Sequence, residues 1–249
     1  MSRSDDPIEG YIDTVDADSS GALEILEHGE IEVLGRMPWS SNGTWLCALS
    51  DGDATCRAIY KPAAHERPLW DFADGLWRRE VATWELAKDL GWNLIPPTIE
   101  RDGPFGVGSL QFFIHARFEE HYFTFRDDAE LRPQLERLCA FDLVSNNTDR
   151  KAGHVLLTDD RRIWGIDHGL NFHEDFKLRT VIWDFAGSPI PSELVEALIA
   201  FVAAPTPERL GELLSENELD AVRQRANAII ASGVFPVDPT GHRIPWPLV

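Results

Sequence analysis

The chain has 249 residues, of which 43% are hydrophobic and 26% charged, enough for one substantial core or for two smaller lobes. Its net charge of −19 disfavours nucleic acids and anionic membranes as general partners, because an acidic surface repels both. The three cysteines lack the spacing of metal ligands, so we interpret them as reduced thiols of a cytoplasmic protein: Cys47, Cys56 and Cys139.

No segment of the sequence predicts a membrane anchor. Residues 1–6 contain neither the basic region nor the apolar core of a secretory signal. The longest apolar-rich run, residues 194–204, is 11 residues long and includes Glu196, so it is too short to span a bilayer. We therefore expect a soluble protein without stable membrane insertion.

The N-terminal part of the chain predicts an antiparallel sheet. Residues 1–20 are acidic, rich in serine and without periodicity, so we expect a flexible segment. A helix should begin at Pro68 and end near Gly91, since prolines follow it. Apolar and β-branched runs separated by turn residues predict five strands, at 31–37, 44–49, 55–61, 97–101 and 109–116. The expected N-lobe, residues 21–118, is thus a sheet with one inserted helix.

The remaining residues, 119–249, predict a mainly helical C-lobe. The expected elements are a helix at 127–143, strands at 155–158 and 162–166, and helices from 190 to 232 that are interrupted at Pro205 and Pro207 and capped at Ser215. The predicted fold class is therefore α+β, with two lobes that meet near residue 118.

Two aspartates in polar loops are the most informative feature of the C-lobe. An apolar run leads into Asn147-Thr148-Asp149-Arg150, and a later short strand ends in Asp167-His168-Gly169. Phosphoryl transfer requires in-line positioning of the reactants and cations that offset charge on the transferred group. One carboxylate that holds the acceptor hydroxyl and a second that binds metal, in this order, indicate a kinase-like site. Two loop carboxylates with no shared role are the alternative interpretation.

These motifs resemble those of the phosphatidylinositol 3-/4-kinase-like group. The run from Asn147 to Arg150, followed by Ile166-Asp167-x-Gly169-Leu170-x-Phe172, is similar to the pattern of type II phosphatidylinositol 4-kinases and HipA-type bacterial protein kinases. Ile59-Tyr60-Lys61-Pro62 resembles their ATP-contacting lysine strand, and residues 108–114 resemble the strand that enters the adenine hinge. Residues 30–185 as a whole resemble a small actinobacterial family of phosphatidylinositol-kinase-like proteins. The resemblance implies a bilobal, atypical protein-kinase-like fold that uses ATP and a divalent metal, Mg²⁺ or Mn²⁺.

The same resemblance implies that Lys61 contacts the phosphates of ATP, whereas a solvated lysine at a strand end is the alternative. Glu80 shares one face of the predicted helix with Trp77 and Trp84. A carboxylate on such a buried face is costly unless a cation meets it, so we predict an ion pair between Lys61 and Glu80. Pairing of Glu80 with a neighbouring arginine on the outside of the helix is the alternative.

Further ATP contacts are expected from main-chain groups. A turn of small residues between the first two strands allows N–H groups to approach phosphates closely, although an ordinary hairpin turn would look the same. The candidate residues of this turn are Ser41, Asn42, Gly43 and Thr44. By resemblance, the adenine contacts are the backbone groups of Ile114, His115 and Ala116.

Roles in the chemistry follow from the loop carboxylates. We predict Asp149 as the base, Asp167 as the principal metal ligand, and Arg150 as a residue that either neutralises charge or braces the loop. His154 stands where the wider kinase group usually has an asparagine that binds the second metal. Because imidazole suits transition metals better than magnesium, His154 indicates an altered metal site, an altered metal preference or a loss of activity; it could also only hydrogen-bond the loop. Other histidines have no matched role and are interpreted as surface or core residues: His121, His168 and His173.

The predicted function is therefore that of an ATP-dependent kinase, which transfers the γ-phosphate to the hydroxyl of an unidentified acceptor. A small polyol or a protein Ser/Thr is favoured over a membrane lipid, because nothing like the Cys-rich membrane-anchoring segment of type II lipid kinases follows Lys61. Two alternatives remain. His154 favours a catalytically silent, ATP-binding pseudokinase that acts as a scaffold, and transfer of AMP by a nucleotidyltransferase is also compatible with the motifs.

Overall fold

The computed structural model describes residues 13–38 and 42–249. The chain folds into two compact units. The first consists of the chain up to Trp77 together with Pro96–Ile114, and the second of Arg78–Ile95 together with His115–Val249. Most of the helix that was expected inside the N-lobe therefore groups with the second unit.

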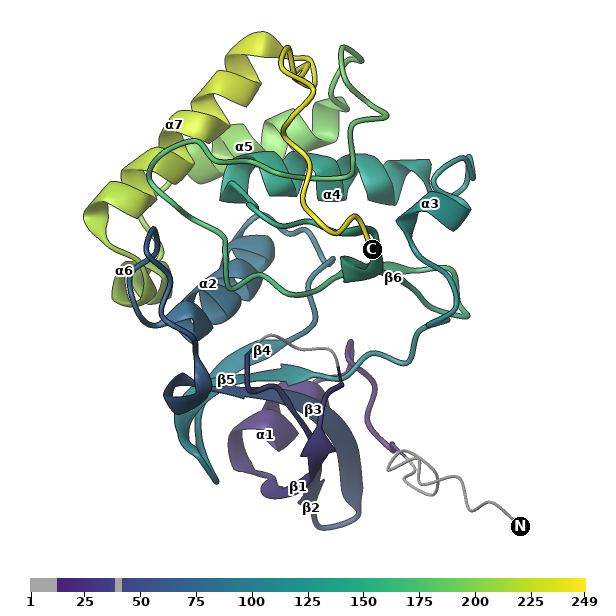
Figure 1. Cartoon of the computed structure of the whole chain (residues 1–249), viewed down its shortest axis with the longest axis vertical. Coiled ribbons are helices and arrows are strands. Elements are labelled where there is room, and N and C mark those ends of the chain that lie inside the picture. Colours follow the sequence, from purple (N-terminus) through teal and green to yellow (C-terminus); the bar gives the residue numbers. More distant parts are fainter. Residues whose placement is uncertain (1–12, 39–41) are drawn as a thin grey trace. The chain divides into compact units, whose positions relative to one another are not determined.

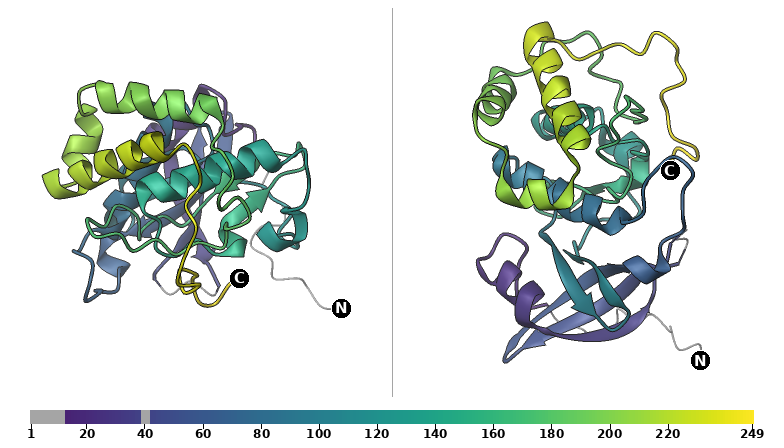
Figure 2. Two further views of the ribbon diagram at one scale, coloured as in Figure 1. Left: turned by 90° about the horizontal axis from the view of Figure 1, so that it is seen from above. Right: turned by 90° about the vertical axis from the view of Figure 1, so that its left-hand side faces the viewer.

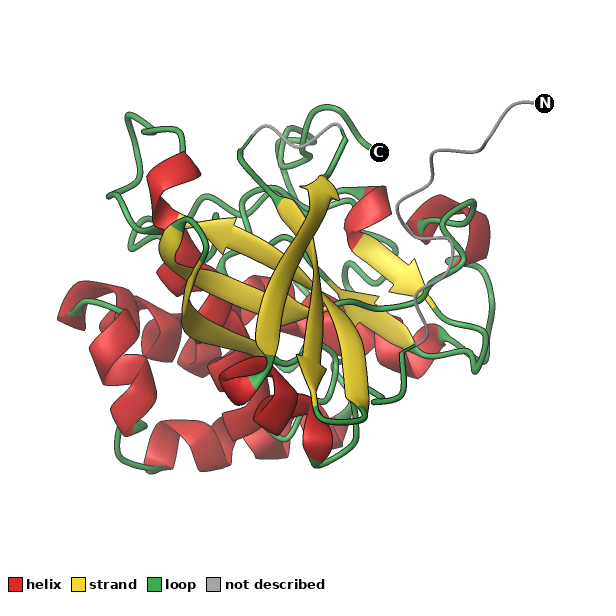
Figure 3. Ribbon diagram, turned by 90° about the horizontal axis from the view of Figure 1, so that it is seen from below, coloured by secondary structure: helices red, strands yellow, loops and turns green. Residues whose placement is uncertain are grey.

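A five-stranded antiparallel sheet forms the first unit, with the strand order β1-β2-β3-β5-β4 (Figure 1; Figure 3). Its strands are β1 (Glu30–Arg36), β2 (Trp45–Asp51), β3 (Ala54–Pro62), β4 (Thr98–Gly103) and β5 (Gly106–Phe112). The short helix α1 (Gly21–His28) buries Ile25 and Leu26. The predicted antiparallel sheet is confirmed.

The end of β3, at Lys61 and Pro62, lies very close to the backbone of β5. In the β3–β5 pair, Lys61 lies opposite Ser109 and Pro62 opposite Gly108. A Cβ atom added at Gly108 would lie 2.3 Å from the carbonyl oxygen of Lys61 and 2.6 Å from the Cα atom of Pro62. Because only glycine fits there, Gly108 lets β5 approach the backbone of Lys61 closely.

The cysteines are buried free thiols. Burial disfavours the thiolate and raises the pKa of Cys47 and of Cys56 to about 12. In the β2–β3 register Cys47 lies opposite Ala58, and Cys56 lies opposite Leu49, so the two thiols are not cross-strand partners. Both residues serve as small members of the core.

Helix α2 (Leu76–Asp89) begins later than predicted, at Leu76 rather than at Pro68. The carboxylate of Glu66 explains this start, since it accepts hydrogen bonds from the backbone N–H groups of Gly75 (3.1 Å), Leu76 (3.0 Å) and Trp77 (2.6 Å). N–H groups at a helix N-terminus have no partner within the helix, and a carboxylate there also meets the positive end of the helix dipole. The helix therefore begins where Glu66 caps it.

Two other predicted boundaries are wrong. The strand expected at 109–116 lies earlier, because its hairpin with β4 already closes at the pair Gly103–Gly106. The helix expected at 127–143 is α4 (Arg132–Ser145), which has a proline in its first turn, a favoured position for that residue. A short helix that was not predicted, α3 (Tyr122–Phe125), precedes it.

Helices are the main regular elements of the second unit (Figure 2). Besides α3 and α4, these are α5 (Ser192–Ala203), α6 (Glu208–Leu213) and α7 (Glu216–Ser232), and the strands β6 (Val155–Leu157) and β7 (Ile163–Gly165) form a separate hairpin. Helix α7 packs against α4, α5 and α6. The predicted cap at Ser215 is present, because its hydroxyl accepts the N–H of Glu218 (3.3 Å) and its own N–H binds the Glu218 carboxylate (2.9 Å). Among the described residues, no helix combines the length and apolar character needed to cross a membrane.

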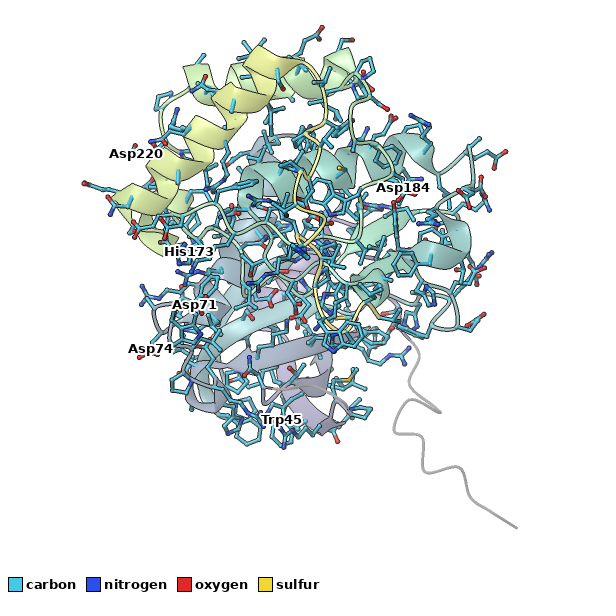
Figure 4. All side chains as sticks on the ribbon, turned by 45° about the horizontal axis from the view of Figure 1, so that its top comes forward. Trp45, Asp71, Asp74, His173, Asp184 and Asp220 are labelled. Carbon is cyan, nitrogen blue, oxygen red and sulfur yellow. The ribbon has the colours of Figure 1, made fainter. Side chains whose placement is uncertain are left out.

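A tyrosine ties α3 to the chain that follows the polar loops. The hydroxyl of Tyr122 donates to Oδ2 of Asp184 (2.6 Å), and Nη1 of Arg126 lies 3.3 Å from Oδ1 of the same carboxylate, which Figure 4 labels. Burial and this hydrogen bond raise the pKa of Tyr122, so the phenol keeps its proton and remains the donor.

The segment after α7 returns to the polar loops of the second unit (Figure 1). The carbonyl oxygen of Arg243 accepts hydrogen bonds from the N–H of Thr180 (3.2 Å) and from the indole of Trp183 (3.0 Å). The carbonyl oxygen of Leu248 accepts the N–H of Ala152 (2.8 Å). The C-terminal segment therefore contacts the loop that carries the predicted base.

Candidate functional site

The candidate site lies in the second unit and starts at the end of α4. Asn146 ends this helix in the left-handed conformation, with φ of 58°. Its side-chain amide donates to the carbonyl oxygens of His173 (2.9 Å) and Asp175 (2.7 Å), and its Oδ1 accepts the N–H of Lys177 (3.0 Å). Asparagine tolerates this backbone conformation better than most residues, so Asn146 both ends the helix and fixes the later loop.

Asn147 then orients the predicted base. Its Oδ1 accepts the backbone N–H of Asp149 (2.9 Å), and its Nδ2 donates to Oδ1 of Asp142 on α4 (3.3 Å). The side chain of Asp149 is 28% exposed, and its Oδ2 lies 2.8 Å from the ammonium group of Lys151. The loop therefore presents a partly exposed carboxylate on a rigid, hydrogen-bonded backbone.

Arg150 is fully buried and contacts no solvent. Its Nε and Nη2 bind the carboxylate of Asp142 at distances of 2.9–3.1 Å, and its Nη1 donates to the carbonyl oxygens of His154 (3.1 Å) and Ile166 (2.9 Å). The Nη2 atom also lies 2.8 Å from Nε2 of His168. Of the two predicted roles for Arg150, this geometry favours bracing of the loop over neutralisation of charge.

Asp167 follows β7 and has a left-handed backbone, with φ of 60°. Its side chain is 51% exposed, and its Oδ2 lies 3.3 Å from Nε2 of His154. The other ring nitrogen of His154, Nδ1, lies 3.1 Å from the carbonyl oxygen of Asp149. His154 therefore contacts both of the predicted site aspartates, the backbone of one and the carboxylate of the other.

The two contacts of His154 fix which ring nitrogen carries a proton. A carbonyl oxygen can only accept, so Nδ1 of His154 donates to Asp149 and, in a neutral ring, Nε2 is an acceptor. Burial, opposed by the nearby Asp167 carboxylate, lowers the pKa of His154 and favours that neutral ring. A lone pair on Nε2 and a carboxylate oxygen 3.3 Å apart repel each other, and either a proton on Nε2 or a cation bound by both atoms relieves this repulsion.

Two observations bear on the predicted metal ligands His154 and Asp167. Metal-binding histidines commonly donate their second ring N–H to a backbone carbonyl, as His154 does to Asp149. In the described part of the chain, no group of three or more His, Cys, Asp or Glu residues is arranged to hold a metal. Magnesium at nucleotide sites is commonly bound by one or two carboxylates together with the phosphates. Binding of a metal by His154 and Asp167 stays a prediction.

Glu80 binds the turn that follows Asp167. Its two carboxylate oxygens accept the backbone N–H groups of His168 (3.0 Å) and Gly169 (3.0 Å), and its side chain is buried. One turn further along α2, the hydroxyl of Thr83 accepts the side-chain amide of Asn171 (3.1 Å). Helix α2 is therefore a support of the Asp-x-Gly turn, a role that the sequence did not indicate. The Lys61–Glu80 ion pair, which would join the two units, stays a prediction.

The predicted phosphate turn lies in the first unit, and two of its backbone N–H groups already have hydrogen-bond acceptors within the protein. The N–H of Gly43 donates to the carbonyl oxygen of His65 (3.2 Å), and that of Thr44 donates to Asn42 (3.0 Å). These two N–H groups are therefore engaged within the protein, which argues against the predicted phosphate contacts of the Gly43 and Thr44 backbone. Ser41 lies outside the described residues.

The predicted adenine contacts follow β5 in an irregular segment. Ile114 is the last residue of the first unit and is buried, whereas His115 begins the second unit and is exposed. Ala116 is half-buried. The three residues thus lie where the chain passes from one unit to the other, and their contact with adenine stays a prediction.

Sequence reasoning missed three residues of the site. Asp142, His168 and Thr180 are buried, and all three belong to the hydrogen-bond network around Arg150. Asp142 carried the only available signal, since an aspartate within the apolar pattern of a helix needs a buried cation. The other two lack such a signal, because their partners come from distant segments.

Comparisons with known proteins support the fold. No protein-family model matches the chain. The crystal structure of the Helicobacter pylori proinflammatory kinase CtkA is similar, with a TM-score of 0.51 and 9% sequence identity, over 84% of this chain and 94% of that one. An identity this low shows the fold alone. The predicted α+β, kinase-like fold is therefore confirmed, whereas the finer resemblance to phosphatidylinositol kinases stays a prediction.

A relative in Mycobacterium tuberculosis gives the family. Protein Rv2133c is 38% identical to the chain over an alignment that covers 90% of this chain and 94% of that protein. Identity at this level over nearly the full length of both proteins implies a common fold. The chain belongs to the same family as Protein Rv2133c, and its fold is kinase-like.

Proposed function

We propose that the protein is an ATP-dependent phosphotransferase that uses Asp149 as the base. The observation that carries the proposal is the pair of contacts made by His154, which links the backbone of Asp149 to the carboxylate of Asp167. A base and a cation-binding carboxylate held close together are the two groups that phosphoryl transfer requires of its protein. The kinase-like fold supports the same reading.

The proposed reaction uses these groups in a defined order. The acceptor hydroxyl gives its proton to the carboxylate of Asp149 while its oxygen forms a bond to the γ-phosphorus. The bond between that phosphorus and the bridging oxygen breaks, and ADP leaves with the electron pair. A divalent cation held by His154 and Asp167 would offset the charge of the phosphates. Lys61 would pair with the phosphates and with Glu80, as the resemblance implies.

The proposed acceptor is a small polyol or a protein Ser/Thr rather than a membrane lipid. The net charge of −19 disfavours docking on an anionic bilayer. The ammonium group of Lys151 lies 2.8 Å from Oδ2 of Asp149 and can donate a hydrogen bond to a polar acceptor there. This part of the proposal follows from charge and leaves the phosphotransfer itself unaffected.

An activity screen tests the function. The purified protein is incubated with ATP, Mg²⁺ or Mn²⁺ and pooled cell extract, and mass spectrometry searches for new products. Asp149→Asn, which keeps the size of the side chain but removes the base, serves as the blank. We expect products that gain a phosphoryl group with the wild type only. Products that gain an adenylyl group would instead identify an AMP transferase.

One observation favours a second function, that of a silent nucleotide-binding protein. His154 occupies the position at which the wider kinase group usually has asparagine, so the site departs from the active pattern. Such a protein would bind ATP without consuming it. Calorimetry that detects ATP binding, together with no product from any acceptor pool and no ADP formed, would support this alternative.

A further inference from the structure

The side chain of Arg150 uses every N–H group it has within the site. A guanidinium carries five N–H donors, one on Nε and two on each terminal nitrogen. Nε and one Nη2 donor bind Asp142, the two Nη1 donors bind the carbonyl oxygens of His154 and Ile166, and the second Nη2 donor faces Nε2 of His168. Arginine cannot accept, so Nε2 of His168 accepts this bond.

The carbonyl partners of Arg150 are placed next to the candidate cation ligands. One belongs to His154 itself, and the other belongs to Ile166, the residue before Asp167. The contact with His168 adds a third point, directly after Asp167. A single rigid group therefore touches the chain at His154 and on both sides of Asp167, while the two ligand side chains lie 3.3 Å apart.

The guanidinium itself is held from α4. The carboxylate of Asp142 binds it through both oxygens and also accepts the hydroxyl of Thr180 (3.3 Å) and the side-chain amide of Asn147 (3.3 Å). Both members of the Arg150–Asp142 pair have no exposed side-chain surface. The planar guanidinium of Arg150, bound on two sides, has one orientation. The ammonium group of a lysine at this position would reach fewer of these hydrogen-bond partners.

We propose that Arg150 is the positioning residue that sets the spacing of His154 and Asp167, and that it thereby sets the affinity of this pair for a divalent cation. Arg150 acts through the backbone and touches neither cation nor acceptor. The inference rests on the proposed function only in taking these two side chains as the cation ligands. Residues that orient metal ligands in this way commonly change metal affinity by about 10–100-fold when replaced.

Titration with Mn²⁺ in the absence and in the presence of ATP, followed by electron paramagnetic resonance of the free ion, tests the proposal on the full chain. The variants are Arg150→Lys, which keeps the charge but loses the fork, and Asp167→Asn, which removes a ligand. Arg57→Lys is the matched control, because Arg57 is also a buried arginine paired with an aspartate, but in the first unit. We expect Arg150→Lys to weaken Mn²⁺ binding about tenfold or more and Arg57→Lys to leave it unchanged.

Three other results would count against the proposal in different ways. Mn²⁺ affinity that is the same in Arg150→Lys and wild type, with binding lost in Asp167→Asn, overturns the positioning role and leaves the proposed function intact. Equal binding by Asp167→Asn and wild type, or no binding by wild type, overturns the ligand assignment itself. Weakening in Arg57→Lys equal to that in Arg150→Lys would show a general effect of losing a buried arginine.

A milder variant keeps the test decisive if Arg150→Lys fails to fold. Thr180→Val removes the hydrogen bond to Asp142 and the one that the Thr180 hydroxyl accepts from the N–H of Ile182 (3.1 Å), and it leaves Arg150 in place. If the network positions the ligands, this variant should weaken Mn²⁺ binding about two- to fivefold, a smaller change than the loss of an entire orienting residue. Unchanged binding in a folded Thr180→Val protein, together with an unfolded Arg150→Lys, would assign the network to folding alone and overturn the proposal.

Discussion

In the described part of the chain, each unit contains a buried arginine–aspartate pair, and the two pairs connect different parts of the structure. In the first unit, Nε and Nη2 of Arg57 lie 3.2–3.3 Å from the carboxylate of Asp13, and the guanidinium stacks over the ring of Phe113 at 5.3 Å. This pair ties the start of the described chain to β3. In the second unit, Arg150 and Asp142 join α4 to the loops of the candidate site.

The comparison teaches that a buried ion pair does not reveal its role by burial or charge. The Coulomb energy of such a pair is largely offset by the loss of hydration, so burial alone is weak evidence of a contribution to stability. What distinguishes the two pairs is the destination of the other guanidinium donors. Those of Arg150 bind the carbonyl oxygens of His154 and Ile166, which belong to the site.

The largest expected effect is that of Asp142→Ala, which breaks the second pair. The change leaves the guanidinium of Arg150 buried without its carboxylate, so we expect a loss of about 3–5 kcal/mol in the free energy of unfolding. Urea unfolding followed by circular dichroism measures it. A loss below about 1 kcal/mol would contradict the buried Arg150–Asp142 pair, because removal of one partner of such a pair leaves an uncompensated buried charge that destabilises the protein by several kcal/mol.

Removal of Asp13 from the Arg57–Asp13 pair should destabilise the protein less than Asp142→Ala does, and it should leave Mn²⁺ binding unchanged. The Asp13 side chain is 10% exposed, whereas that of Asp142 has no exposed surface, so water can partly solvate Arg57 in Asp13→Ala. We expect a loss of about 2–3 kcal/mol in the free energy of unfolding, at or below the lower end of the range for buried pairs. Mn²⁺ affinity should match that of wild type, and a fall in that affinity would contradict the division of roles between the two pairs.

Glu80→Gln tests the support that α2 gives to the turn after Asp167. A glutamine oxygen can accept the N–H of only one of His168 and Gly169, and its amide group cannot accept the other, so we expect a loss of about 1–2 kcal/mol. Hydrogen exchange at the two N–H groups measures the effect directly, with faster exchange expected at one of them. Glu85→Gln is the matched control on the same helix, since Glu85 forms its salt bridge with Lys88 instead.

The smallest effect on stability is expected for His154→Asn. The side chain is mostly buried but asparagine can still donate to the carbonyl oxygen of Asp149, so we expect a change of about 1 kcal/mol or less. Metal choice should change more, with preference moving from Mn²⁺ toward Mg²⁺ as an oxygen ligand replaces imidazole. Parallel titrations with both ions check this. The same preference in both proteins would mean that His154 only hydrogen-bonds the loop.

Local patterns predicted much of this fold. Strand alternation and turn residues placed the sheet, because neighbouring residues decide both. The start of α2 was missed, since it depends on the side chain of Glu66, which caps the helix from outside it. Element boundaries of this kind depend on capping contacts that the periodicity of apolar residues does not report.

The site was predictable only in outline. The order of Asp149 and Asp167 indicated two cooperating carboxylates, and the structure brings both against His154. The network around Arg150 was not predictable, because Asp142 and His168 reach it from different segments. Nor did small residues at the phosphate turn reveal that the N–H of Gly43 is already bound to His65.

Each unit is built from two separate stretches of the sequence, and this limits how the protein can be cut into fragments that fold. The second unit consists of two separate stretches of sequence, Arg78–Ile95 and His115–Val249. A gene fragment that encodes only the later stretch would lack Glu80 and would leave the N–H groups of His168 and Gly169 without their acceptor. The second unit is therefore not encoded by one continuous stretch of sequence, and an isolated version of it would need a linker in place of residues 96–114.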